Sequence, residues 1–437
     1  MRRVGLLILM LAVAGCGKSP SAGPKSVADA RAYAELPGLR RSPHEGLQAE
    51  LARLTDEQRT PLQLASAQVV APVTTMVTAR PSELTPQVAI REAYPSLSRG
   101  MHEELLERID PNRDWRVGPV ERELLRDFVT RTAPHRDKFR LALERAEGGL
   151  GIDPAMGPLA ELDFIEPLHL GCRVVGYTSV HHLADNDVTS ALHSLTTMLK
   201  AAELLAREQH VACRLLAANC RADALRVLQL IVQHRHFNAS HLDSVGARID
   251  ETLRQWPSDA QAWIGERASG LIAYELVRDG HYLALLDRDE VERLEKHHML
   301  KTTARAVMGG VDEDQHFYLQ SLRQLIDGCR LPFCERVPLL ANIRRELSES
   351  ESTQRYPIVA ALLLDDFERV HQRQAEDLAR CVAWNTALRI ARGQQASSET
   401  PLNALSGKPY LATVEDQRVR ISGVLLDTDE PVEVPLP

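Results

Sequence analysis

The strongest constraint on the fold is a helical repeat of apolar side chains that runs from about residue 120 to residue 393. Apolar residues recur there at three- and four-residue spacing, which places them on one face of a helix. The segment 213–235 is apolar over most of its circumference, so we expect it to be the central core helix. The pattern predicts helices at 120–132, 135–149, 186–210, 213–235, 241–255, 258–279, 287–308, 313–328, 336–350 and 357–393.

The succession of helices joined by short turns invites comparison with helical repeat proteins. We find no period of about 34 residues and no Trp-Leu-Gly-Tyr signature of the tetratricopeptide repeat. The predicted fold class is therefore mainly α, an irregular helical bundle or helical array with a small C-terminal β-hairpin.

Composition changes along the chain predict its domain organisation. Residues 31–98 include a helical pattern near "HEGLQAELARLTDEQ", but repeated prolines make this a proline-interrupted, partly helical region. The helical body then spans 99–395, and residues 396–437 form a C-terminal tail.

The tail reads "SGKPYLATVEDQRVRISGVLLD" at 406–427. Its turn residues are followed by alternation through Val414, Val419 and Ile421, which predicts a small β-hairpin after the last helix.

This tail resembles the C-terminal segment of the major pseudopilins of type II secretion. The residues that carry the resemblance are Gly407, Pro409, Tyr410, Ser422, Gly423 and Asp427. The chain departs from that family at 401–403, where Pro-Leu-Asn replaces Asp-Pro, and it has no prepilin N-terminus, so calcium ligands are not carried over. A long helical body followed by such a tail resembles uncharacterised helical envelope proteins of planctomycetes, which implies no activity.

The first sixteen residues resemble the leader of a bacterial lipoprotein. Arg2 and Arg3 precede an apolar run at 4–13, which is shorter than the roughly 20 residues that a membrane-spanning helix needs. The following Val13-Ala14-Gly15-Cys16 resembles a lipobox. The resemblance implies that the signal peptide 1–15 is removed and that Cys16 carries diacylglycerol and a fatty acyl group such as palmitate.

A lipidated Cys16 fixes the expected location. Two or three acyl chains anchor a protein stably, at about 0.8 kcal/mol per buried CH₂. Residues 16–30 are small, polar and proline-bearing, which predicts a flexible tether. We expect a lipoprotein anchored to a membrane of the cell envelope on its periplasmic side. Gly17 favours the outer membrane, because an aspartate there retains proteobacterial lipoproteins at the inner membrane.

Charge and composition exclude some partners. The formal net charge is −8, whereas nucleic-acid-binding proteins carry a basic footprint. Aromatic residues make up only 4%, so few rings can stack on bases or sugars. We therefore predict no nucleic acid partner, and a carbohydrate-binding role is disfavoured.

Six cysteines remain once Cys16 is lipidated, and the envelope permits disulfides. Cys329 and Cys334 flank a proline in "CRLPFC", where a loop disulfide is the alternative to two thiols. Cys213 and Cys220 lie about 10 Å apart on one helical face, too far for a bond. Buried thiols are expected for the others.

The chain has sixteen histidines, but none falls in a recognised metal-binding motif. "VHHLADND" (180–187) is interpreted as a loop with a capping Asp, and "QHRHFNASH" (233–241) as histidines at a helix end. "GGVDEDQHF" (309–317) is interpreted as an acidic first turn of a helix. Asp365 and Glu368 in "LLLDDFERV" share a helix face, as an acid pair or as a solvated acidic face.

Motifs for nucleophilic catalysis, phosphate loops and cofactors are also not found, so we identify no catalytic residue, metal ligand or cofactor. The leading hypothesis is a membrane-anchored envelope lipoprotein that acts through protein–protein contacts. The alternative is a metal-dependent hydrolase whose site is built from His and Asp/Glu of separate helices. A third reading, solute capture for an uptake system, would require alternating strands and helices.

Overall fold

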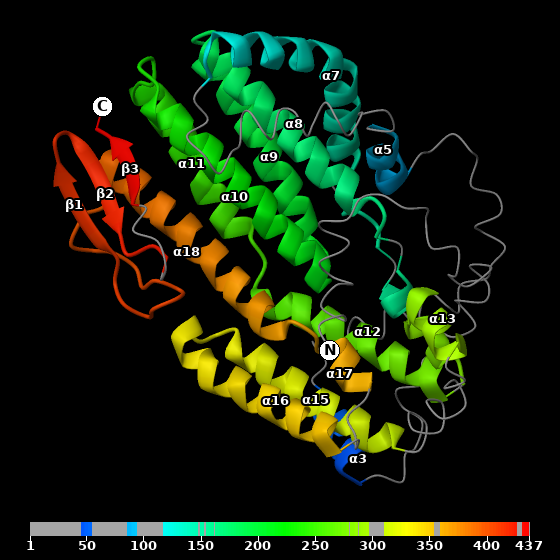
Figure 1. Ribbon diagram of the computed structural model, residues 1–437. Helices are drawn as coiled ribbons and strands as arrows, with labels where there is room; N and C mark the ends of the chain where they lie inside the picture. The colour runs from blue at the N-terminus through cyan, green and yellow to red at the C-terminus, as the bar shows by residue number, and fades with distance from the viewer. Residues whose placement is uncertain are drawn as a thin grey trace.

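The computed structural model describes residues 45–54, 85–93, 117–146, 149–152, 154–160, 162–278, 280–286, 288–296, 310–353, 359–425 and 431–436. These residues form a mainly α fold with a small C-terminal sheet, as the sequence predicts (Figure 1). The α-helices are α3 (Glu45–Ala52), α5 (Pro86–Ala93), α7 (Pro119–Arg145), α8 (Ile165–Ala184), α9 (Val188–Arg207), α10 (Val211–Gln233), α11 (Ala239–Gln255), α12 (Asp259–Arg278), α13 (Arg288–Lys296), α15 (Val311–Gly328), α16 (Phe333–Thr353), α17 (Val359–Leu363) and α18 (Phe367–Ala391). Two 3-10 helices, η3 (Pro154–Leu159) and η4 (Tyr282–Leu285), and the strands β1 (Leu411–Glu415), β2 (Arg418–Ser422) and β3 (Val432–Pro435) complete the set.

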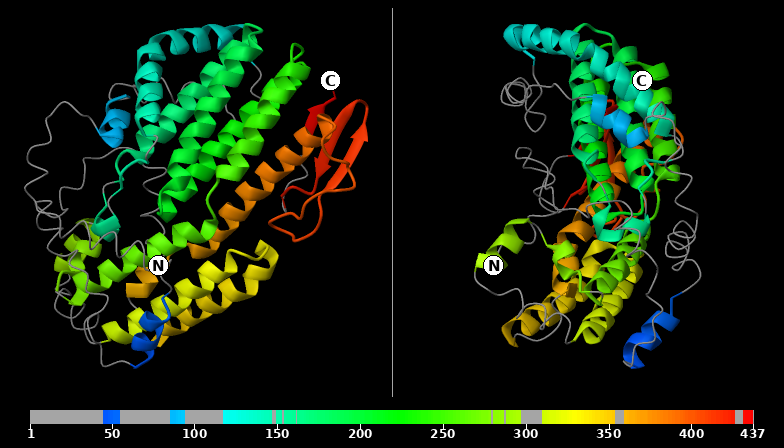
Figure 2. Two further views of the ribbon diagram at one scale, coloured as in Figure 1. Left: turned by 180° about the vertical axis from the view of Figure 1, so that it is seen from behind. Right: turned by 90° about the vertical axis from the view of Figure 1, so that its right-hand side faces the viewer.

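The buried apolar residues form two main cores. The large core joins α5, α7, α8, α9, α10, α11, the C-terminal half of α18 and the sheet. The small core joins α3, α12, η4, α15, α16, α17 and the N-terminal half of α18. Figures 1 and 2 show the two helix groups one above the other, with α18 passing from the lower group to the sheet. Each core therefore receives one half of the same helix.

The large core is built mainly from helices that the periodicity predicts. The central helix α10 packs against α8, α9, α12, α18 and β3, which confirms its predicted position. The predicted helices 120–132 and 135–149 are joined as α7, which bends sharply in Figure 1 and contains Pro134. A proline inside a helix removes a backbone hydrogen bond and displaces the preceding turn. Arg136 donates instead to the carbonyl oxygen of Val129, at 2.6 Å.

Helix α8 is not predicted by the sequence pattern. Its residues from Val174 to Val180 are all buried, because neighbouring helices cover it on nearly every side. A helix that is apolar all round has no amphipathic stripe to reveal it. The interpretation of 180–187 as a loop is therefore wrong for its first part, since His181 and His182 lie in the last turn of α8.

The small core places a carboxylate among tyrosines. Asp314 is fully buried and accepts hydrogen bonds from the Tyr274 hydroxyl at 2.6 Å and from the backbone N–H groups of Val359 and Ala360 at 2.8 Å. Asp314 belongs to the acidic first turn of α15, as predicted. It also satisfies N–H groups at the start of α17, which would otherwise lack acceptors. The Tyr318 hydroxyl in turn donates to the carbonyl oxygen of Glu266 at 2.8 Å.

The single predicted helix 357–393 is wrong, because the chain forms α17 and α18 with a break between them. Asp366 has a left-handed backbone with φ of 55° directly before α18 begins. Asp365 and Glu368 consequently do not share one helix face as an acid pair. Glu368 instead pairs with Arg344 of α16 at 3.2 Å.

The tail contains the predicted hairpin and adds a third strand. The strands form an antiparallel sheet in the order β1-β2-β3. Asp416 and Gln417 both have positive φ, of 48° and 57°, which is typical of a two-residue type I′ turn. Val419 and Ile421 of β2 are fully buried against the large core, so the inner face of the sheet closes it.

The segment before the sheet is fixed to α16. The backbone N–H of Phe333 donates to the carbonyl oxygen of Ala404 at 2.8 Å, and that of Cys334 donates to Leu405 at 2.9 Å. Asn403 is buried and donates to the carbonyl oxygens of Gly423 and Val424. These bonds hold the tail between the two helix groups.

Candidate functional site

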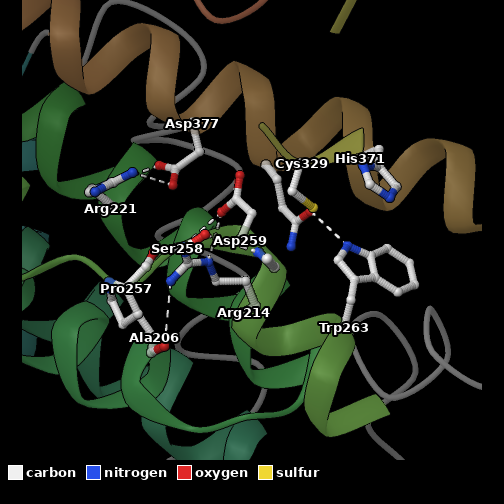
Figure 3. Close-up of polar contacts among 12 residues, drawn as sticks. Ala206, Arg214, Arg221, Pro257, Ser258, Asp259, Trp263, Cys329, His371 and Asp377 are labelled. Atoms are coloured by element: carbon white, nitrogen blue, oxygen red, sulfur yellow. Dashed lines mark hydrogen bonds and ion pairs between the residues drawn. The ribbon is translucent and has the colours of Figure 1, made fainter. Parts of the chain in front are cut away.

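The densest group of buried polar side chains lies where the two cores meet (Figure 3). We name this group the junction layer. It consists of Arg214, Arg221, Trp256, Asp259, Trp263, Arg336, His371, Gln374 and Asp377. Its members come from α10, the connection before α12, α12, α16 and α18.

A buried ion pair joins α10 to α18. Arg221 donates from Nε to Oδ1 of Asp377 at 2.8 Å and makes a second bond to the other carboxylate oxygen. The Trp256 ring covers the guanidinium carbon at 3.4 Å from the ring centroid. Burial lowers the pKa of Arg221, but the Asp377 carboxylate more than offsets this, so the pKa lies above its ordinary value. Arg221 is therefore charged, while burial raises the pKa of the Asp377 carboxyl despite the nearby Arg221 charge.

Arg214 forms a second buried pair at the start of α12. Its Nη2 lies 2.7 Å from Oδ1 of Asp259 and also donates to the carbonyl oxygen of Pro257. Its Nη1 donates to Ala206, at the end of α9. One side chain thus connects α9, α10 and the chain entering α12.

His371 and Trp263 stack at the small-core side of the layer. Their ring centroids lie 4.8 Å apart with an interplanar angle of 13°, and the indole N–H donates to Gln374 at 3.2 Å. Burial, and then the charge of Arg336, lowers the pKa of His371 to about 3, so the ring is neutral. Arg336 lies 3.3 Å from Nδ1 of His371. Because a guanidinium only donates, Nδ1 is the acceptor and Nε2 carries the proton.

The junction layer is suited to holding the two cores together. Arg214 and Arg221 meet carboxylates, and Arg336 donates to the carbonyl oxygens of Leu331 and Cys329. The charged groups are thus engaged with one another or with the backbone. The layer therefore fixes how the helices sit, and it brings no nucleophile next to a general base.

The cysteines selected from the sequence can now be placed. Cys16 lies outside the described residues, so its lipidation stays a prediction. Cys329 and Cys334 are both free thiols, and the bridge between them also stays a prediction. The Cys329 thiol donates to the carbonyl oxygen of Leu325 on its own helix, and burial raises its pKa to about 12. Cys334 is exposed.

The four other cysteines that the structure describes are buried thiols, as expected. Cys213 and Cys220 both lie on α10. The neighbouring Cys172 thiol of α8, together with burial, holds the pKa of Cys220 well above its ordinary value.

The histidine-rich segments 180–187 and 233–241 lie at helix ends. Asp187 accepts a hydrogen bond from the Ser190 N–H at 3.0 Å and caps α9, which confirms the predicted capping Asp. His181 lies 3.6 Å from Asp185 in the last turn of α8. His234 is the residue at the end of α10, as predicted, whereas His241 lies in the first turn of α11.

These groups do not converge on one point. Within the described ranges, no three His, Cys, Asp or Glu residues lie close enough to hold a metal ion. Other histidines of the chain, such as His297 and His298, lie outside those ranges, and the metal-dependent hydrolase stays an alternative prediction.

Comparison with known proteins adds no family to this description. No family model, no curated protein and no solved structure matches the chain. Among the helices that the structure describes, none combines the length and the apolar character required to span a bilayer.

Sequence reasoning missed the junction layer because its partners are remote in the chain. Arg221 and Asp377 are 156 positions apart. One signal was present, since "CRADALRVLQL" places charges inside the helix expected to be most buried. Charged residues are almost never fully buried unless paired, so Arg221 or Asp223 in such a helix indicates a partner elsewhere.

Proposed function

We propose that this protein is a lipid-anchored envelope protein that acts by binding another protein. The observation that carries the anchor is the sequence Val13-Ala14-Gly15-Cys16 after a short apolar run. A chain tethered through Cys16 and the polar segment 17–30 presents its helical body to partners at the periplasmic side of a membrane, with the outer membrane favoured by Gly17.

Support for a protein partner comes from the edge of the tail sheet. β1 is an edge strand, and Leu411 and Val414 expose 70% and 48% of their surface. Glu415 and Arg418 flank the two-residue turn and exchange hydrogen bonds, so the peptide groups of Ala412 and Val414 point outward. Such an edge pairs with an extended segment of another chain.

Further apolar side chains lie near this edge. Among the described residues, the large apolar side chains that are exposed include Leu402 in the segment before β1 and Leu331 and Val337 at the start of α16. The hydrogen bonds from Phe333 and Cys334 to the 404–405 segment hold these parts side by side. We name Leu331, Val337, Leu402, Leu411 and Val414 the tail surface. Exposed apolar groups of this kind mark protein interaction sites.

The test is an affinity purification of the tagged full-length protein from crosslinked, detergent-solubilised envelopes. A Cys16→Ala variant removes the lipid, and a Leu411→Lys/Val414→Lys variant blocks the edge, because lysines oppose strand pairing. The matched control is Val120→Lys/Leu141→Lys, which places the same charges on exposed positions of α7.

We expect one partner to be recovered with the wild type and the α7 control, and to be lost in both other variants. A protein recovered alone and monomeric from every sample would overturn the proposal. If recovery of the partner required Cys16 but not an intact β1 edge, the lipid anchor would remain part of the proposal and the sheet edge would be excluded as the contact.

A further inference from the structure

A strip of arginines lines the side of the molecule where α8, α10 and α18 lie together. Arg226 of α10 is exposed and donates to Oδ1 of Asp223 at 2.9 Å. The same carboxylate has Arg173 of α8 at 4.0 Å and His169 at 3.5 Å from Oδ2. Burial raises the pKa of Asp223, but the hydrogen bond with His169 and the charges of Arg226 and Arg173 lower it more, so the pKa lies below its ordinary value.

Two more arginines reach this strip from α18. Arg373 donates to Glu376 at 2.9 Å. Arg380 is half-buried, and among the described residues it has neither a hydrogen bond nor an ion pair. Burial lowers its pKa; the carboxylates of Glu376 and Asp377 oppose this, while Arg226 and Arg373 add to it. Arg380 thus lies near charges of both signs and has no hydrogen-bond acceptor of its own among the described residues.

The charges on this strip do not balance. The four arginines Arg173, Arg226, Arg373 and Arg380 face two carboxylates, Asp223 and Glu376. Asp377 is nearby, but both of its oxygens are bonded to Arg221 on the buried side of α10. The surplus of positive charge lies on a chain whose formal net charge is −8. We name these four arginines the arginine strip.

We propose that the arginine strip binds a phosphate group that is either free or esterified only once, as in a phosphate monoester. All four cations are arginines, whose planar guanidinium groups donate paired hydrogen bonds to phosphate oxygens. A phosphate monoester carries a charge of about −1.5 to −2 at neutral pH, which matches the surplus. The group can come from free phosphate or from a lipid headgroup that ends in phosphate. Binding here does not require lipid on Cys16 or a protein partner.

The experiment is calorimetric titration of the purified full-length protein in uncharged detergent at low salt. The probes are inorganic phosphate, dihexanoyl phosphatidic acid and dihexanoyl phosphatidylglycerol, which is an anionic diester. We expect saturable binding of inorganic phosphate and of phosphatidic acid, and at least tenfold weaker binding of the diester phosphatidylglycerol. Phosphatidic acid binding at least tenfold more tightly than phosphate would identify the lipid headgroup as the source, and equal affinity would identify free phosphate.

Three variants assign the binding to these residues. Arg380→Gln and Arg226→Gln should each weaken phosphate binding at least tenfold. Arg380→Lys keeps the positive charge but lacks the paired donors of the guanidinium group, and it should weaken binding less. The control Arg389→Gln changes an exposed arginine further along α18 and should leave the affinity unchanged. The thermal unfolding temperature measured by circular dichroism should be the same in all four variants or rise slightly in Arg380→Gln, because a half-buried charge that burial disfavours is removed.

Several results would overturn the proposal. They are no saturable binding of inorganic phosphate or of phosphatidic acid, an Arg380→Gln affinity equal to that of the wild type, or equal binding of phosphatidic acid and phosphatidylglycerol. None of these results would affect the recovery of a protein partner, so failure of this site is distinct from failure of the proposed function.

Discussion

The two cores of this molecule are packed by different means. The large core uses alanines at helix contacts, such as Ala191, Ala201, Ala202 and Ala217, which let α8, α9 and α10 approach one another closely. The small core uses Tyr274 and Tyr318 around the buried Asp314. The large core therefore depends on shape, whereas the small core also depends on particular hydrogen bonds.

A glycine in α12 illustrates the close packing around Tyr318. A Cβ added at Gly270 would lie 2.1 Å from the Tyr318 hydroxyl oxygen. The ring occupies the space that any other residue would need. The small core therefore accepts few substitutions, and its stability depends on polarity and pH. The stability of the large core depends mainly on side-chain volume.

The largest expected effect is at the junction between the cores. Asp377→Ala leaves the Arg221 guanidinium buried without its carboxylate, and we expect the free energy of unfolding to fall by about 3–5 kcal/mol. The double variant Arg221→Met/Asp377→Leu should recover most of this loss. Denaturant unfolding followed by circular dichroism measures both. A loss below about 1 kcal/mol in the single variant would show that the pair does not hold the cores together.

The next effect concerns the small core alone. Asp314→Ala removes the acceptor of two backbone N–H groups and of the Tyr274 hydroxyl, each costing about 1–3 kcal/mol when left unsatisfied. We expect a total loss of about 3 kcal/mol by denaturant unfolding. Asp314→Asn keeps the shape and one acceptor and should lose less. If both variants were as stable as the wild type, the small core would depend on shape, like the large one.

Low pH should destabilise the protein through His371, on the small-core side of the junction layer. The pKa of His371 is about 3 in the folded protein, below the value of 6.5 that applies to the unfolded chain. The unfolded state therefore binds more protons between these values, and stability falls as pH decreases from about 6.5 towards 3. We expect a loss of about 2 kcal/mol between pH 7 and pH 4.5.

Denaturant unfolding at a series of pH values measures this loss. His371→Asn is the control, because it cannot titrate and should reduce the slope. A wild type and a variant with equal slopes would assign the acid sensitivity to other groups.

The smallest effect belongs to the large core. Asp187→Ala removes the cap of α9 and should cost about 1 kcal/mol. Asp187→Ser retains a capping oxygen and should stay close to the wild type. Thermal unfolding of both variants at one pH distinguishes them. If the Ala variant were as stable as the Ser variant, the Asp187 side chain would not stabilise the protein by capping α9.

The helices of the body were predictable because their burial is periodic. α9, α10, α11, α12 and α15 each lie within a few residues of their predicted bounds. Apart from α10, their apolar faces meet the cores while their other faces meet solvent, which leaves the periodicity in the sequence. The central helix α10 was instead recognised by apolar residues over most of its circumference.

What could not be predicted has a physical reason in each case. α8 is buried on nearly all sides, so it carries no periodic signal. The break before α18 depends on the left-handed backbone of Asp366. An aspartate tolerates this conformation, but its presence in the sequence does not predict it. The junction layer and the arginine strip depend on residues from helices far apart in the chain, and only the fold brings these together.

The division of α18 between both cores also affects how the molecule is made. A growing chain emerges at about 5–20 residues per second, N-terminal parts first. Helices α7 to α11 are complete long before Phe367 is synthesised, yet the small core cannot close before the N-terminal half of α18 is added, and the large core also needs the C-terminal half and the strands. The body therefore reaches its native state only after β3 has been synthesised. A chain cut before α18 would leave apolar faces of both cores open to aggregation and proteolysis.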